Sequence, residues 1–300
     1  MILIDKHIRR SYIELHIAVL FWGFSAILAD LINLSWFMIT LWRVFLASLG
    51  LLILLKLLQI PFKVKKKDVI RFSGIAVIIA LHWLTFFGSV KYANASIALV
   101  TYASFSFMVS VLEPIINRTK FSLLDMAFGL IIIPAMFLIV HSIDFSLHFG
   151  FAIGLISSLL AALFGVLNKK LISQADPLVI TCIEMIAATL FLSILLPIWY
   201  HYNPKDVMIP NGSDWVYLAI LALGCTCLAF YILVRALRYI SMFAQSMVMN
   251  LEPVYGVVFA ILILNDDKEL NSFFYVGVFT ILLTVFLHPI IKRKYSEVSN

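Results

Sequence analysis

Apolar stretches of about 20 residues recur along the whole chain, and only short polar connections separate them. A helix needs roughly 20 mostly apolar residues to cross a hydrocarbon core about 30 Å thick. With 63% hydrophobic and 13% charged residues, the connections leave no room for a water-soluble domain. The sequence therefore predicts an all-α polytopic membrane protein with ten transmembrane helices, at 12–31, 36–58, 70–90, 94–117, 122–140, 148–171, 178–200, 214–238, 242–264 and 272–291.

The basic residues are sorted by the connection in which they lie. Of the 22 Lys and Arg, 18 fall at the two termini and in every second connection, Arg43 lies inside a span, and the alternate connections hold only Lys91, Lys205 and Lys268. Because cytoplasmic connections are enriched in Lys and Arg, both termini are expected in the cytoplasm, at a bacterial-type inner membrane. No cleavage pattern follows the first apolar stretch, so that helix is expected to be retained. The net charge of +6 then needs no nucleic-acid partner.

The chain also resembles itself at an offset that grows from 141 to 148 residues. MITLWRVFLASLGLLILL from Met38 aligns with VITCIEMIAATLFLSILL from Val179. Further pairs follow in order: Trp22-Gly23 with Phe164-Gly165, Lys91-Tyr92 with Arg238-Tyr239, and Gly129 with Gly277. These matches predict two five-helix repeats, at 12–140 and 148–291. Since five is odd, the second repeat enters the membrane inverted, as in many secondary transporters.

Four segments carry a resemblance to a known family. They read FWGFSAI from Phe21, HWLTFFGSVKYANAS from His82, LEPIINR from Leu112, and RALRYISMFAQSMVMNLEPVYGVVFAILIL from Arg235. The chain resembles the EamA-type transporters of the drug/metabolite transporter superfamily over nearly its whole length. The resemblance implies ten spans in two EamA repeats, with amino acids or related amphiphilic metabolites as the solutes.

The ninth predicted span carries the most deeply placed acid. Glu252 lies near its centre, and Pro253 leaves the carbonyl of Met249 without its usual helical donor. Gln245, Met249, Glu252 and Tyr255 recur at helical spacing, which predicts a cavity-lining face. The alternative is that Glu252 only completes a packing network and never touches a solute.

Three other ionisable residues lie deep inside predicted spans, where such groups usually line cavities, pair or carry function. His82 is a candidate to bind a carboxylate or take up a proton, and the alternative is a hydrogen bond to a neighbouring helix. Arg43 and Glu184 occupy equivalent repeat positions, in the outer and inner halves of the membrane respectively. Arg43 is a candidate to bind an anionic group or to pair with Asp30 or Glu252. Glu184 is a candidate proton or cation site, with structural pairing as the alternative.

Trp22, Phe86, Tyr102 and Asn168 are the candidates to complete an amphipathic pocket, because aromatic faces accept apolar and cationic groups. The chain has 25 Phe, 11 Tyr and 6 Trp, so most of its aromatic residues must pack or face lipid. The predicted cavity therefore combines aromatic walls with Arg43, His82 and Glu252. The candidate proton-coupling groups are Glu252, Glu184 and His82.

The function expected from these features is secondary transport of a small metabolite by alternating access, in the direction of export. A GxxxxGK[ST] motif is absent, so a gradient rather than ATP hydrolysis is expected to supply the energy, with protons as the candidate coupling ion. An intramembrane enzyme using His82 with a buried carboxylate is the alternative; the chain lacks GxSxG, HExxH and clustered Cys/His motifs. A channel or receptor would need a filter loop or sensor segment. No metal or cofactor is expected, and the protein is expected to be a monomer or weak dimer in the bilayer.

Overall fold

The computed structural model describes residues 6–142, 144–241, 245, 248, 249, 251–264, 272, 273, 275–277, 279, 280, 283, 284, 287, 290 and 291. All regular structure in this part is helical. Seven helical segments are long and apolar enough to cross a membrane: His7–Leu31, Trp36–Leu57, Lys66–Tyr92, Ala95–Asn117, Phe145–Leu171, Pro177–Tyr202 and Asp214–Ala236. The chain is therefore an integral membrane protein.

Each of these seven segments coincides with one predicted span, and the predicted span 122–140 is helical as well. The predicted spans 242–264 and 272–291 lie partly outside the described residues. The count of ten spans therefore stays a prediction.

In the first half of the chain, two helices begin at an N-cap formed by a short polar side chain. The Ser35 side chain accepts from the Met38 amide, and Asn94 Oδ1 accepts from the Ile97 amide at 2.8 Å. The predicted span 94–117 is broken at residues 103–104, where Ser104 Oγ donates to the carbonyl of Thr101. The helices are α1 (Lys6–Leu31), α2 (Trp36–Leu57), α3 (Lys66–Tyr92), α4 (Ala95–Tyr102), α5 (Phe105–Asn117) and α6 (Leu123–Ser142).

In the second half, the middle of the span 214–238 is not α-helical. Ile220–Leu228 forms a π-helix, η2, in which the Thr226 hydroxyl donates to the carbonyl of Leu221 five residues earlier. Such wide turns are rare and occur often at functional sites. The other elements are the short 3₁₀ turn η1 (Phe145–Leu147), α7 (His148–Leu171), α8 (Pro177–Tyr202), α9 (Asp214–Ala219), α10 (Ala229–Ala236) and α12 (Glu252–Leu264).

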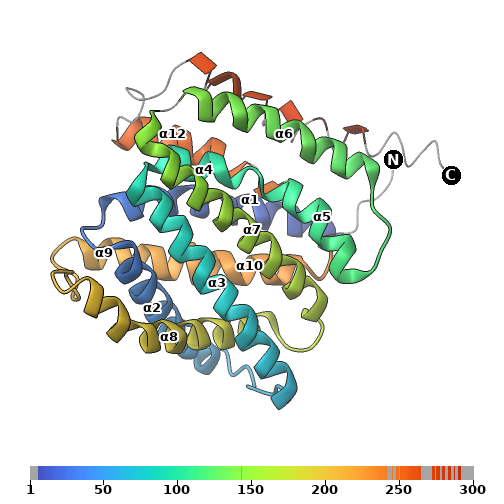
Figure 1. Cartoon of the computed structure of the whole chain (residues 1–300). Helices are drawn as coiled ribbons and strands as arrows, with labels where there is room; N and C mark the ends of the chain where they lie inside the picture. Colours follow the sequence, from blue (N-terminus) through green and yellow to red (C-terminus); the bar gives the residue numbers. More distant parts are fainter. Residues whose placement is uncertain are drawn as a thin grey trace.

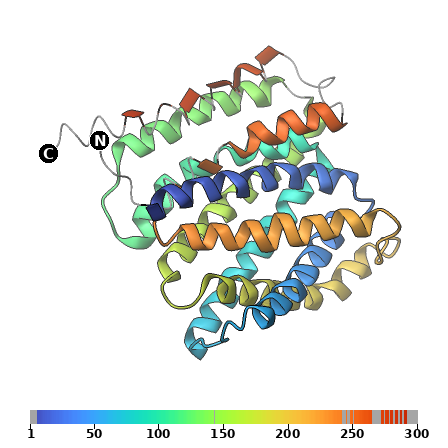
Figure 2. The ribbon, with the colours of Figure 1, turned by 180° about the vertical axis from the view of Figure 1, so that it is seen from behind.

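The helices form one bundle (Figure 1), in which α3 packs along α7 and α8, and α2 packs against α8. Seen from behind, α1 lies between α10 and α12 (Figure 2). α4 contacts both α7 and α12, whereas α6 lies at one edge against α5. α1 therefore lies inside the bundle, in contact with α3, α4, η2, α10 and α12.

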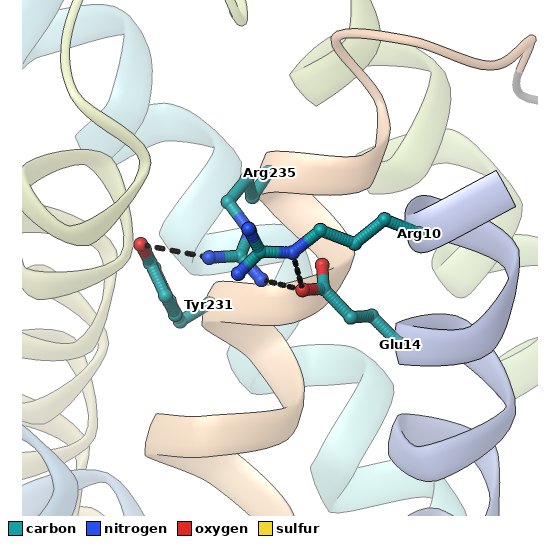
Figure 3. A network of polar contacts seen from close by, with 4 residues as sticks. All are labelled: Arg10, Glu14, Tyr231 and Arg235. Carbon is teal, nitrogen blue, oxygen red and sulfur yellow. Dashed lines mark hydrogen bonds and ion pairs between the residues drawn. The ribbon is translucent and has the colours of Figure 1, made fainter. Parts of the chain in front are cut away.

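A network of polar contacts joins α1 to the end of α10 (Figure 3). Glu14 accepts from Arg10 Nε at 2.7 Å and forms an ion pair with Arg235 of α10. Arg235 Nη1 also lies 3.4 Å from the Tyr231 hydroxyl. This network holds the helix that carries Trp22 against the helix that continues η2.

Small residues set the distance between α7 and the end of α3. A Cβ built on Gly150 would lie 2.6 Å from the Ala93 Cβ and 2.8 Å from its backbone nitrogen. Gly150 therefore has no space for even one methyl group without a shift of the backbone.

We expect Gly150→Ala to lower the melting temperature of the purified protein, although Ala favours helices more than Gly does. Overpacking of this kind costs roughly 1–3 kcal/mol. Gly74→Ala is the matched control, because nothing lies within 4 Å of a Cβ there, and its melting temperature should stay level or rise. Equal melting temperatures of the two variants would contradict the close packing at Gly150.

Candidate functional site

A cavity of about 30 Å³ lies in the interior, where α1, α2, α3, α7 and α10 meet. It is lined by Trp22, Ser25, Arg43, His82, Trp83, Phe86, Tyr102, Phe164, Phe230, Leu233, Met249 and Glu252. None of these residues is more than 8% exposed. A volume of this size has room for about one or two water molecules and for no metabolite. A solute can therefore reach these residues only when the helices move.

The π-helix η2 holds the buried guanidinium of Arg43. Arg43 Nε donates to Thr226 Oγ1 at 2.6 Å, and Nη2 donates to the carbonyl of Cys225 at 3.1 Å. The same carbonyl accepts from Trp22 Nε1 at 2.9 Å. Because the Thr226 hydroxyl gives its own proton to Leu221, its lone pairs are free for Arg43. η2 therefore places acceptors for both Arg43 and Trp22 in the interior of the bundle.

The partners of Arg43 are all uncharged. Its guanidinium carbon lies 4.1 Å from the centroid of the Trp83 ring and 5.4 Å from that of Phe87. Of the two alternatives for Arg43, direct pairing with Asp30 or Glu252 is not present as an ion pair, because no described carboxylate lies within 4.0 Å of it. Two of its nitrogens donate to η2 instead, and Glu252 interacts with it electrostatically from a longer distance. The positive charge therefore faces the cavity without an ion-pair partner there.

Glu252 begins α12 and faces the same cavity. It interacts electrostatically with Arg43 and Tyr102, but it makes no hydrogen bond or ion pair within the described part of the chain. A guanidinium and a carboxyl group thus line one small cavity without forming an ion pair.

His82 is oriented by Ser157 of α7. Its Nδ1 lies 2.9 Å from the Ser157 carbonyl oxygen and 2.8 Å from Ser157 Oγ. A carbonyl oxygen can only accept, so we assign the ring proton to Nδ1. Nε2 is then an acceptor, and no described residue donates to it. The rings of Phe86, Tyr102 and Phe164 lie 5.5 to 6.1 Å away, centroid to centroid.

Seven of the ten predicted lining residues meet at the cavity: Trp22, Arg43, His82, Phe86, Tyr102, Met249 and Glu252. Gln245, Tyr255 and Asn168 do not line it. Gln245 is fully buried, with Nε2 3.5 Å from Met249 Sδ. Tyr255 lies where α12 packs on α1, with its Cβ 3.2 Å from the position of a Cβ at Gly23. Asn168 lies beside Glu184, which also stands outside the cavity.

Other lining residues escaped prediction from the sequence. Phe164 is the repeat counterpart of Trp22, so the alignment of the two halves contained the signal for it. Trp83 and Phe230 are ordinary members of apolar helices, with centroids 6.1 Å apart. Nothing in the sequence pattern marks Thr226 or Ser157, because their roles depend on which helix each one faces.

A family model described as the EamA-like transporter family matches the chain twice, at residues 10–141 and 148–288. The chain belongs to the EamA-like transporter family. Its two EamA copies cover nearly all of its length, and family membership makes it a membrane transporter of small solutes. The resemblance of the four segments is thereby confirmed.

Solved structures share the fold of this EamA-family transporter. Of 29 matching chains, one, described only as "Crystal structure of protein", has a TM-score of 0.72 and 11% sequence identity over 96% of this chain and 99% of that one. At this identity the likeness concerns the fold alone. A search of curated proteins finds no match.

Proposed function

We propose that this EamA-family transporter exports a small zwitterion with an apolar side chain, an amino acid or a related metabolite, across a bacterial-type cytoplasmic membrane by alternating access. The observation that carries the proposal is that one basic and one acidic side chain line the same cavity, where a solute ammonium group would stabilise the ionised form of Glu252. Arg43 and Glu252 face one space, do not pair with each other, and are surrounded by aromatic rings.

Each part of such a solute has a partner among the lining residues. The carboxylate suits the guanidinium of Arg43, whose Nη1 has no acceptor among the described residues. The ammonium group suits Glu252 and the Nε2 lone pair of His82. An apolar side chain suits the rings of Phe86, Phe164 and Phe230. Specific binding sites commonly combine apolar walls with a few placed polar groups in this way.

Alternating access is supported by the burial of every lining residue and by matching contacts in the two halves. α3 packs on α7 as α10 packs on α1, and α5 packs on α7 as α12 packs on α1. Lys91, at the end of α3, donates to the carbonyl of Ile32 at 2.9 Å; Arg238, after α10, donates to that of Ala175 at 2.6 Å. These paired contacts favour two inverted halves, 12–140 and 148–291, that exchange their arrangements during transport. The distribution of Lys and Arg favours both termini in the cytoplasm.

The test is counterflow in proteoliposomes with labelled phenylalanine and two analogues, phenethylamine and 3-phenylpropionate, each of which lacks one charge. Phenylalanine or another apolar amino acid should accumulate, and the single-charge analogues should compete at least about tenfold more weakly, since each leaves one buried charge without a partner. Equal competition by all three would contradict the proposed zwitterion site. Recovery of the solute chemically unchanged would separate transport from the enzyme alternative.

A further inference from the structure

A second polar pair lies outside the cavity, on α7 and α8, which both pack along α3. Glu184 of α8 is 0% exposed and Asn168 of α7 is 2% exposed. The two side chains are neighbours. Neither oxygen of Glu184 and neither polar atom of the Asn168 amide has a hydrogen-bond partner in the described part of the chain. Buried polar groups are nearly always satisfied, so this pair calls for a ligand or a proton.

No basic side chain among the described residues pairs with Glu184. α2, α3 and α10 pack against α8, and α7 carries Asn168; no described Lys, Arg or His nitrogen on these helices lies within 4.0 Å of the carboxyl group. Four basic groups on these helices have other partners: Arg43 bonds to η2, His82 to Ser157, Arg235 to Glu14, and Lys169 to the carbonyls of Leu237 and Ile240.

An ionised carboxylate without a partner is strongly disfavoured in such a place. A hard metal cation would need several oxygen ligands. Glu184 and Asn168 together supply two carboxyl oxygens and one amide oxygen, fewer than such a cation takes, and the described residues hold no group of three or more His, Cys, Asp or Glu that could bind a metal ion. A proton needs only one acceptor, so it is the ligand that this pair can hold.

We propose that Glu184 and Asn168 form a proton-binding site, separate from the solute cavity, that must be occupied for the transporter to close. In the closed state the Glu184 carboxyl group is neutral, and its O–H donates to Asn168 Oδ1. When the helices around this pair move apart and water enters, the acid releases its proton to water and becomes a carboxylate. It takes a proton back before the helices close again. The proton is then a condition for each crossing, with or without solute, and this role rests on the alternating access proposed above.

The site itself is tested by infrared spectroscopy of the purified protein, without any solute. A stretching band of a protonated carboxyl group should be present at neutral pH, should shift on exchange into D₂O, and should lose a component in Glu184→Gln. Glu252→Gln is the matched control and should keep the component that Glu184→Gln removes. A band that persists unchanged in Glu184→Gln, or the lack of any such band in the natural protein, would overturn the proposal.

Its consequence is tested by counterflow in proteoliposomes with equal pH on both sides. Above the midpoint, the rate of the natural protein should fall about tenfold per pH unit, as the protonated fraction of one acid does. Glu184→Gln should exchange at all these pH values with a flat profile. If the exchange rate of Glu184→Gln depended on pH as that of the natural protein does, the proposed proton site would be wrong, but the proposed transport would not be affected. If no solute moved at all, transport would be wrong, and the infrared band would still decide the proton site.

Discussion

Replacement of Glu252 by Gln is expected to weaken the binding of a zwitterionic solute by about 100-fold, because its ammonium group then meets a neutral amide in a buried site. The loss of one partner of a buried charge pair costs roughly 2–5 kcal/mol, and about 3 kcal/mol corresponds to that factor. The same change should leave binding of 3-phenylpropionate unaltered or stronger, since Arg43 remains and the nearby negative charge is gone. The expected result is therefore a reversal of selectivity rather than a uniform loss.

Quenching of tryptophan fluorescence by the solute is a suitable measurement, because Trp22 and Trp83 both line the cavity. Glu14→Gln is the matched control: it removes the same charge from α1 at the network with Arg10 and Arg235, away from the cavity. It should leave the ratio of the two affinities unchanged. A parallel drop in the affinity for both solutes in Glu252→Gln would show that Glu252 supports packing and does not recognise the ammonium group.

Replacement of Arg43 by Lys is expected to reduce the affinity for the solute nearly as much as Glu252→Gln does, although the positive charge is kept. Arg43 uses two nitrogens on η2 and still presents a third to the cavity, and it lies over the Trp83 ring. A Lys ammonium is a single point of charge and cannot satisfy both η2 acceptors while it reaches a carboxylate. We expect a fall of about 100-fold in affinity for phenylalanine, and for 3-phenylpropionate as well, measured by the same fluorescence titration.

Thr226→Val tests whether η2 positions Arg43. Valine has nearly the shape of threonine but cannot accept the hydrogen bond from Arg43 Nε. The double variant Thr226→Val with Arg43→Lys should lose clearly less binding free energy than the sum of the losses in the two single variants. The reason is that both substitutions break the same interaction. Full additivity of the two losses would mean that other contacts position Arg43. Thr181→Val is the control for the loss of a buried hydroxyl, because the Thr181 hydroxyl donates to the carbonyl of Pro177 and does not contact Arg43.

Much of the fold was predictable because hydropathy is a local property of about 20 residues. The predicted span 36–58 and the helix Trp36–Leu57 differ by one residue at one end, and the family was evident from the segments around His82 and Glu252. The break between α4 and α5 was not predicted, because both sides of it are equally apolar. Likewise the π-helix was hidden, since its sequence ILALGCTCL has the composition of an ordinary span.

The candidate site residues were found because a polar group inside a span is costly and usually lines a cavity, forms a pair or carries function. This rule selects single residues, but it does not say which of them contact one another. It singled out Arg43, His82 and Glu252, which do face one cavity, and Glu184, which does not. It also suggested carboxylate partners for Arg43, whereas the structure supplies the Thr226 hydroxyl and the Cys225 carbonyl, more than 180 residues away in the chain. The rotation of each helix about its axis, and the extra residue per turn in η2, decide which atoms meet. Local hydropathy determines the length and position of a span in the sequence. The rotation of each helix about its axis depends instead on how all the helices pack together.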